Sequence, residues 1–298
     1  MTKPFYTVQS SNSSYCATNQ RIKGDKSFAR SDKCEQVSAI DIAELWLAIE
    51  RNELELFFQP QLNLDTGKIR GAEALVRWNH PSRGLLAPDQ FLYLIGESSI
   101  NVKLGEWVLE TAIRIQSERK DDLSISINIT PYHLQQETFF TSLVNTLLKY
   151  PDSNPEMLTI ELTETTCISD FSNLERSMKN CRKLGVKFSL DDFGTGYSTF
   201  SQLGLLPISE LKVDKSFVQA LDADVKIEKM VEGVVLLADF YGVDVVAEGI
   251  ETSETLLLVK GKKCTIGQGY FYSKPMPYQR FNSWVKQHSS KYFVNSYA

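Results

Sequence analysis

The chain has 298 residues, of which 42% are hydrophobic and 23% are charged, so it is long enough for one barrel-sized globular domain with a buried core. The formal net charge of −5 argues against a broad basic face, and a polymeric nucleic acid is therefore not expected as a partner. No run approaches the roughly 18 apolar residues of a membrane helix, and the opening residues lack the apolar core of a signal peptide, which predicts a cytoplasmic chain with no membrane partner.

The chain is expected to divide into three parts. Residues 1–38 are rich in Ser, Asn, Lys and Thr and show no sustained hydrophobic period, which predicts a flexible or loosely attached leader. The folded domain is expected over residues 39–285. It would begin with a helix whose apolar residues follow a stripe from Ile40 to Ile49, with Ser38 and Asp41 as candidate N-caps. Residues 286–298 would form a C-terminal tail.

Eight strand-like runs follow the first helix, and most are separated by segments with helical period. The runs are "LELFFQPQLNL", "IRGAEALVRW", "LSISINI", "MLTIEL", "VKFSL", "ELKV", "VDVVAE" and "TIGQGYF". This alternation predicts the α/β class and a modified TIM (β/α)8 barrel. Only "DTGK" joins the first two runs, and such a hairpin turn implies one antiparallel strand. A doubly wound open sheet is the alternative, but it normally carries a Gly-rich phosphate loop after its first strand, and this sequence has none there.

Polar side chains recur at the ends of these predicted strands. In a (β/α)8 barrel the chemistry lies at the C-terminal strand ends, so these groups would meet at one mouth. They are Glu73, Asn128, Glu161, Glu164, Asp191, Asp192, Lys212, Asp214, Glu248, Glu251 and Gln268. A single Asp or Glu there is more often a solvated loop residue or a helix cap. So many together would repel by several kcal/mol unless divalent cations neutralised them. Oxygen ligands with one Asn favour Mg²⁺ or Mn²⁺, and the chain lacks the Cys/His spacing of a zinc site.

The stretch "KFSLDDFGTG" places two carboxylates side by side where a strand ends. Asp191 followed directly by Asp192 allows one carboxylate to bridge two metals while its neighbour completes the second site. Two-metal sites of this kind clamp the attacking and leaving oxygens in phosphoryl chemistry. Gly194 and Gly196 would then let the following loop turn sharply beside the site. The sequence therefore predicts two divalent cations at one site.

The same segments resemble the EAL-domain family of cyclic di-GMP phosphodiesterases. The triplet Glu73-Ala74-Leu75 lies within "GAEALVRWNHPSRGLLAP". The other family motifs are "FQP" at 58–60, "NIT" at 128–130, "ELTE" at 161–164, "DDFGTGYST" at 191–199, "LKVD" at 211–214, "AEGIET" at 247–252 and "QGYFYSKP" at 268–275. The resemblance covers about residues 40–280. It implies hydrolysis of cyclic di-GMP to linear pGpG, a homodimer, and a bacterial signalling role that favours motile over sessile, biofilm-forming behaviour.

The resemblance also implies a role for individual residues. The first metal would be held by Glu73, Asn128, Glu161 and Asp191, and the second by Asp191 and Asp192. Lys212 would help activate the nucleophilic water, with Glu248 and Gln268 completing its shell, and whether Lys212 or Glu248 is the base stays open. The positions matched to substrate contacts are Gln59, Leu75, Arg77 and Asp214. The element that couples metal binding to dimerisation would comprise Glu164 and the loop with Phe193, Gly194, Thr195 and Gly196.

The sequence departs from the family pattern at three positions. Thr130 and Thr199 stand where Ser is usual, and Gln61 replaces an aliphatic residue, but none of these changes removes a metal ligand. Gln61 would lie on the first strand and could change how that strand packs in the pocket wall or add a polar contact there. Arg77 has an alternative reading as a surface ion-pair residue, although strand alternation places it on the face that carries Glu73.

The complete ligand set favours an active enzyme over two alternatives. One alternative is a catalytically silent cyclic di-GMP receptor or a protein-binding EAL module. The other is a barrel enzyme that acts on a different phosphate ester.

Overall fold

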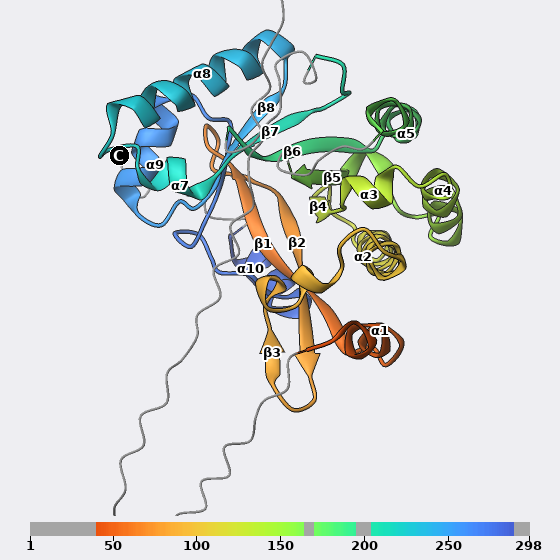
Figure 1. The fold of residues 1–298 in the computed structure, drawn as a ribbon. Coiled ribbons are helices and arrows are strands. Elements are labelled where there is room, and N and C mark those ends of the chain that lie inside the picture. Colours follow the sequence, from red (N-terminus) through yellow and green to blue (C-terminus); the bar gives the residue numbers. More distant parts are fainter. Residues whose placement is uncertain (1–39, 164–169, 195–203, 289–298) are drawn as a thin grey trace, which may run out of the picture. The chain divides into compact units, whose positions relative to one another are not determined.

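A computed structural model describes residues 40–163, 170–194 and 204–288 of the chain. In these residues eight strands pair into a closed barrel, which can be followed in Figure 1. In chain order the barrel strands are β1 (Leu54–Asn63), β2 (Ile69–His80), β4 (Ser124–Asn128), β5 (Leu158–Thr163), β6 (Lys187–Phe193), β7 (Glu210–Val213), β8 (Asp244–Ala247) and β9 (Ile266–Gln268). Neighbours from β2 round to β9 are parallel, whereas β1 is antiparallel to both β2 and β9. The predicted TIM-like barrel with one antiparallel strand is confirmed.

Two short strands extend the sheet beyond the barrel. β3 (Gly84–Leu86) pairs antiparallel with the far end of β2, and β10 (Met276–Pro277) pairs antiparallel with β1. β2 therefore continues well past the barrel rim, which Figure 1 shows at the end of the barrel that carries β3. As a consequence Glu73 lies in the middle of its strand, and not at the strand end that the sequence suggested.

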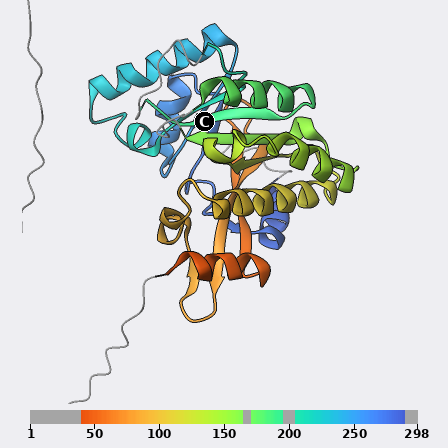
Figure 2. The ribbon, with the colours of Figure 1, turned by 45° about the vertical axis from the view of Figure 1, so that its right-hand side comes forward.

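Helices cover the outside of the barrel, as Figures 1 and 2 show. They are α1 (Ile42–Glu50), α2 (Ser99–Ser117), α3 (Pro131–Leu134), α4 (Phe139–Lys149), α5 (Phe171–Lys183), α7 (Lys215–Gln219), α8 (Val225–Tyr241), α9 (Ser253–Gly261) and α10 (Tyr278–His288). α1 begins with a capping box in which the Asp41 side chain accepts from the backbone N–H of Glu44, so the predicted cap at Asp41 is confirmed. None of the helices within the described residues is long and apolar enough to cross a membrane.

The segment "DQFLYLIGES" has a helical period in the sequence but does not form one continuous helix. It contains two short 3₁₀ turns, η1 (Pro88–Gln90) and η2 (Leu92–Leu94), and a third 3₁₀ turn, η3 (Pro155–Met157), precedes β5. The segment from Pro131 to Lys149 is likewise divided into two helices, α3 and α4. A helical period in the sequence does not distinguish one long helix from several shorter turns, because short 3₁₀ turns also serve as connectors between longer elements.

Strand alternation separates an apolar layer from a polar barrel interior. Ile127, Ile160, Leu211 and Val245 are buried and belong to the hydrophobic core that the strands share with the helices. The buried polar residues that alternate with this layer or lie on the neighbouring strands are Gln59, Gln61, Glu73, Ser126, Thr159, Glu161, Ser189, Glu210, Lys212 and Gln268. The apolar layer stabilises the fold, and the polar interior leads up to the candidate site.

His133 in α3 is buried in this scaffold without a polar contact for its Nδ1 among the described residues. Its ring packs edge to face against Phe139, and a Cβ added at Gly105 would come within 2.1 Å of Nδ1, so this contact needs glycine. Burial lowers the pKa of His133 from 6.5 to about 4. The folded protein thus holds this histidine neutral.

We predict that His133 makes the protein less stable as the pH falls from about 6.5 towards 4. Below pH 6.5 the unfolded chain binds a proton that the folded protein excludes, so the free energy of unfolding should fall by roughly 2–3 kcal/mol across this window. Urea unfolding of wild type and His133→Gln at pH 7 and pH 4.5 measures the difference. The variant should lose less stability between the two pH values. Equal losses in both proteins would contradict the predicted role.

Candidate functional site

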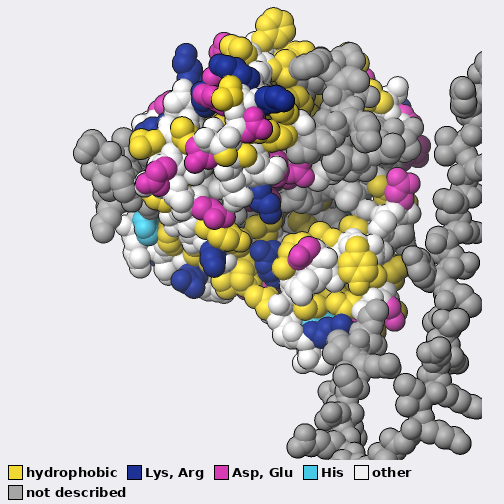
Figure 3. All heavy atoms as spheres, turned by 60° about the vertical axis from the view of Figure 1, so that its left-hand side comes forward, with side chains coloured by type: hydrophobic (Ala, Val, Ile, Leu, Met, Phe, Trp, Pro, Cys, Tyr) yellow, Lys and Arg dark blue, Asp and Glu magenta, His cyan; other side chains and the backbone are white. Residues whose placement is uncertain are grey.

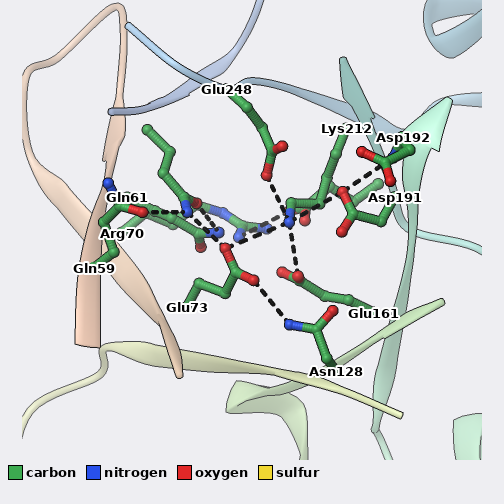
Figure 4. Close-up of polar contacts among 12 residues, drawn as sticks. Gln59, Gln61, Arg70, Glu73, Asn128, Glu161, Asp191, Asp192, Lys212 and Glu248 are labelled. Carbon is green, nitrogen blue, oxygen red and sulfur yellow. Dashed lines mark hydrogen bonds and ion pairs between the residues drawn. The ribbon is translucent and has the colours of Figure 1, made fainter. Parts of the chain in front are cut away.

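A buried lysine lies at the centre of the acidic residues at the mouth of the barrel. The ammonium nitrogen of Lys212, on β7, is 2.7 Å from Glu161 Oε2, 2.7 Å from Glu248 Oε1, 3.3 Å from Asp191 Oδ1 and 3.5 Å from Glu73 Oε2. Figure 4 shows these carboxylates converging on it from different strands. The side chain of Lys212 is only 1% exposed, so solvent screens these ion pairs weakly. One cation therefore holds four carboxylates together.

The electrostatic balance of the cluster follows from these contacts. Burial alone would lower the pKa of Lys212, but the surrounding carboxylates raise it well above its usual range, so the residue is an ammonium. Burial raises the pKa of Glu161 well above its usual range and that of Glu248 to about 8. Burial also acts to raise the pKa of Glu73, but Lys212 and hydrogen bonds from amide side chains outweigh it and hold that pKa low. One ammonium is too little charge for this many carboxylates.

Asp191 and Asp192 face the same mouth because β6 ends in an irregular turn. In a regular strand two adjacent side chains point to opposite faces. The register between β6 and β7 shifts between Leu190 and Phe193, and Asp192 has a positive φ of 56°. Carboxylate oxygens of Asp191, Asp192 and Glu248 consequently lie within 4.8 Å of one another. Burial, followed by the charge of Asp191, raises the pKa of Asp192 to about 6.

Amide side chains form the other side of the cluster. Asn128 Nδ2 donates to Glu73 Oε1 at 2.8 Å, and Gln268 Nε2 donates to Glu73 Oε2 at 2.6 Å. Gln268 also donates to Gln59 Oε1 at 3.1 Å, and Gln61 Nε2 donates to Gln268 Oε1 at 2.9 Å. Figure 4 shows Gln59 and Gln61 extending from β1 on this side of Glu73. Both oxygens of Glu73 are thereby held by neutral donors.

The donor set fits hard divalent cations. The cluster offers carboxylate oxygens and one Asn, and among the described residues it includes no Cys or His. If all five carboxylates are ionised, they exceed the single ammonium by four negative charges, which two divalent cations would balance. The carboxylates are Glu73, Glu161, Asp191, Asp192 and Glu248.

A cavity of about 340 Å³ adjoins the acidic cluster. Glu73, Asn128, Glu161 and Asp191 contribute to its lining, and apolar side chains from β2, η2 and α2 supply much of the remainder. These apolar side chains are Leu75, Val76, Leu92, Ile95, Leu104 and Val108. The site thus combines a charged cluster with an apolar recess large enough for part of a small ligand.

The structure brings most of the predicted site residues to this mouth. Those in the cluster are Gln59, Glu73, Asn128, Glu161, Asp191, Asp192, Lys212, Glu248 and Gln268. Leu75 lines the adjoining cavity. Phe193 is buried and Gly194 has a positive φ of 95° next to the Phe217 ring, as a glycine at a sharp turn should. Glu164, Thr195 and Gly196 lie outside the described residues.

Two predicted substrate contacts have other partners in the structure. Arg77 is half-buried and lies on the same face of β2 as Glu73 and Leu75. Its guanidinium is 5.6 Å from the centre of the Phe57 ring, and its Nη1 donates to the Val76 carbonyl at 2.8 Å. Asp214 is the N-cap of α7, where its side chain accepts from the backbone N–H of Ser216 at 2.9 Å.

Sequence analysis missed Asn101, which lines the cavity from α2. Its Nδ2 donates to the Gly96 carbonyl at 2.7 Å, and its Oδ1 accepts from the Thr130 hydroxyl at 2.6 Å. Thr130 also caps α3 by accepting from the backbone N–H of His133. The available signal was an Asn at a position where the helical period calls for an apolar residue. A buried Asn at such a position needs a polar partner. Thr130 thus has a defined structural role.

A family model and several relatives match the chain. The model of the EAL domain matches residues 42–275. The chain belongs to the EAL-domain family. It is 34% identical over 260 residues to a protein of Pseudomonas aeruginosa named cyclic di-GMP phosphodiesterase PA2567, covering 86% of this chain and 44% of that protein. It is also 35% identical over 238 residues to MucR of the same organism, named a bifunctional diguanylate cyclase/cyclic di-GMP phosphodiesterase, covering 78% and 35%.

Solved EAL structures share the fold. A structure titled PaMucR phosphodiesterase, c-di-GMP complex, superposes with a TM-score of 0.75 at 34% identity and covers 80% of this chain and 98% of that one. The EAL enzyme Bd1971, in a form with cAMP and cyclic di-GMP bound, gives a TM-score of 0.77 at 33% identity and covers 82% and 67%. The chain spans less than half the length of the two Pseudomonas aeruginosa relatives, PA2567 and full-length MucR.

We predict that the positive φ at position 192 limits which side chains this position tolerates. Asp192→Asn should keep the fold, because Asn tolerates a positive φ, whereas Asp192→Val should be less stable than Asp192→Asn by roughly 1–2 kcal/mol. Thermal unfolding in the absence of divalent cations measures both. Equal stability of the two variants would contradict the strained backbone at this position.

We also predict that Lys212→Met strongly destabilises the metal-free protein. The change leaves Glu73, Glu161, Asp191 and Glu248 buried without their cation, a loss of about 3–5 kcal/mol. Unfolding in EDTA measures the loss, and added Mn²⁺ should recover part of it by binding the folded state. Lys149→Met is the matched control, because Lys149 pairs with Glu110 on the exposed surface and its loss should cost little. Similar losses in the two variants would refute this account of the cluster.

Proposed function

We propose that the protein hydrolyses cyclic di-GMP to linear pGpG by attack of water on one phosphodiester bond, with two Mg²⁺ or Mn²⁺ ions at the site. The observation that carries the proposal is the convergence of Asp191, Asp192 and Glu248 within 4.8 Å beside the Glu73 and Glu161 carboxylates. Such a cluster suits phosphoryl chemistry, and relatives at about one third identity are named for this activity.

The residues around the cluster have distinct proposed roles towards the cations. Glu73, Asn128, Glu161 and Asp191 would hold the first ion. Asp191 and Asp192 would hold the second, with the bulge in β6 directing both side chains to one point. When bound, the ions would polarise the phosphate and lower the pKa of a water molecule.

The contacts favour Lys212 as a donor over Lys212 as a base. Its ammonium already faces four carboxylates, which hold it protonated, so it would orient the nucleophilic water or stabilise a phosphate oxygen. Glu248 Oε1 lies 2.7 Å from the Lys212 ammonium, and the carboxylates of Asp191 and Asp192 lie beside Glu248. We therefore assign proton acceptance to Glu248, and Gln268 to holding Glu73 in place.

The proposed substrate matches the chemistry of the mouth. The apolar recess lined by Leu75 and residues of α2 would receive a guanine base. Arg77 and Gln59 would contact the phosphate and nucleotide, and Asp214 would lie at the edge beside Asp192. Figure 3 shows acidic, basic and hydrophobic side chains interspersed over one face, which favours a small ligand over a nucleic-acid polymer there.

A homodimer is part of the proposal. The large apolar side chains of α8 support it, because Leu236 and Phe240 are exposed, the latter by 81%. Such side chains offer a surface for a second copy, and Glu164 and the loop after Phe193 would couple that contact to the metals. The cytoplasmic location, the leader and the tail stay predictions from the sequence.

Hydrolysis is tested with purified protein, cyclic di-GMP and Mg²⁺ or Mn²⁺, following pGpG by chromatography. We expect product from wild type, and a loss of at least the roughly 10- to 100-fold expected for a disturbed metal site in Glu73→Gln. Glu118→Gln, at an exposed surface ion pair with Arg114, is the control and should keep full activity. Cyclic di-GMP binding without product in wild type would instead identify a nucleotide receptor.

A further inference from the structure

Gln61 is a fully buried amide inside the barrel that the proposed chemistry does not use directly. It lies on β1 with its Cα opposite that of Gln268 on β9, and it is 0% exposed. An amide there must be paired, because an unpaired buried polar group is costly.

A chain of hydrogen bonds gives the glutamine side chains one consistent orientation. The backbone carbonyl of Ser273 can only accept, and Gln59 Nε2 donates to it at 3.2 Å, which turns Gln59 Oε1 towards Gln268. Gln268 Nε2 donates to that oxygen, so Gln268 Oε1 faces Gln61 and accepts from its Nε2 at 2.9 Å. The backbone carbonyl at one end thus fixes which way each amide points.

This orientation matters for Glu73. Gln268 Nε2 also donates to Glu73 Oε2 at 2.6 Å, so the same nitrogen serves both Gln59 and Glu73. A rotated Gln268 amide would direct its oxygen at the Glu73 carboxylate and its nitrogen at the Gln61 nitrogen. An aliphatic side chain at position 61 would leave Gln268 Oε1 buried without this donor and remove one of the contacts that hold the Gln268 amide in place.

The Gln61 amide also has an unfavourable effect on the stability of the fold. Its own Oε1 is buried and has no hydrogen-bond partner among the described residues. An aliphatic side chain would avoid that cost, so what distinguishes the amide at this position is the donor that it gives to Gln268.

We propose that Gln61 is a positioning residue that acts through Gln268 to hold Glu73 in the orientation needed for a divalent cation. The inference rests on the proposed function, in which Glu73 is a metal ligand. Groups that orient metal ligands from behind typically change metal affinity by about 10- to 100-fold when removed. Gln61 stands one step further out, behind Gln268, so its effect must pass through that residue.

The test measures Mn²⁺ affinity of the metal-free full chain by titration calorimetry, without substrate. The proteins are wild type, Gln61→Met, Gln268→Met and the double variant. Methionine keeps the length of the side chain and removes the donor. We expect Gln61→Met to weaken Mn²⁺ binding by about 10-fold, Gln268→Met at least as much, and the double variant no more than Gln268→Met alone.

Thr159→Val is the matched control, because Thr159 is equally buried inside the barrel and its hydroxyl has no partner among the described residues. It should leave Mn²⁺ affinity unchanged. Circular dichroism checks that each variant is folded. Gln61→Leu, which also removes the donor, replaces Gln61→Met if that variant does not fold.

The outcomes separate the inference from the proposed function. Wild type that binds no Mn²⁺ would overturn the proposed function and the inference with it. Wild type that binds Mn²⁺, with unchanged affinity in the Gln61 variant, would overturn the inference alone. Additive losses in the double variant would do the same, since they would show that Gln61 does not act through Gln268.

Discussion

The ammonium of Lys212 is the interaction on which the mouth of the barrel depends. Side chains from β2, β5, β6 and the end of β8 bring carboxylates within 3.5 Å of it. Without a central cation these groups would repel across a buried space, and the closure of the barrel would force that repulsion on the fold. One ammonium makes the arrangement tolerable and leaves an excess of negative charge. The folded protein therefore holds a site that attracts divalent cations.

The antiparallel first strand gives this site two chemically different sides. Because β1 pairs with both β2 and β9, its inward residues stand between Glu73 and Gln268. These residues are Gln59 and Gln61, which are neutral, whereas the parallel strands on the opposite side present acids and Lys212. Glu73 lies at the boundary, held by amides on one side and near the ammonium on the other. The reversed strand thus supplies orientation where the parallel strands supply charge.

The sequence was informative where the structure depends on local pattern. Alternating apolar runs identified the barrel strands, and the rule that parallel strands end at one mouth brought Glu161, Lys212 and Glu248 together correctly. The turn at Asp192 could not be foreseen, because it depends on the register between β6 and β7, which is a contact between distant segments. The position of Glu73 inside its strand was missed for a similar reason, since β3 lengthens β2 by pairing beyond the barrel. Asn101 was hidden within a helical stripe, and its partner Thr130 lies far away in sequence.

The acidic cluster and the apolar recess of the mouth fit the proposed substrate, cyclic di-GMP, better than a simple phosphate ester. A small phosphate would need only the acidic cluster with its cations, and it would leave the apolar recess beside Leu75 and Leu104 without a role. A polymer would need a broad basic track, which the net charge of −5 argues against. A dinucleotide has a phosphodiester for the charged cluster and flat bases for an apolar recess. Because the recess and the cluster share Glu73 and Asn128 as lining residues, binding of a base would place the phosphodiester next to the acids that are proposed to act on it.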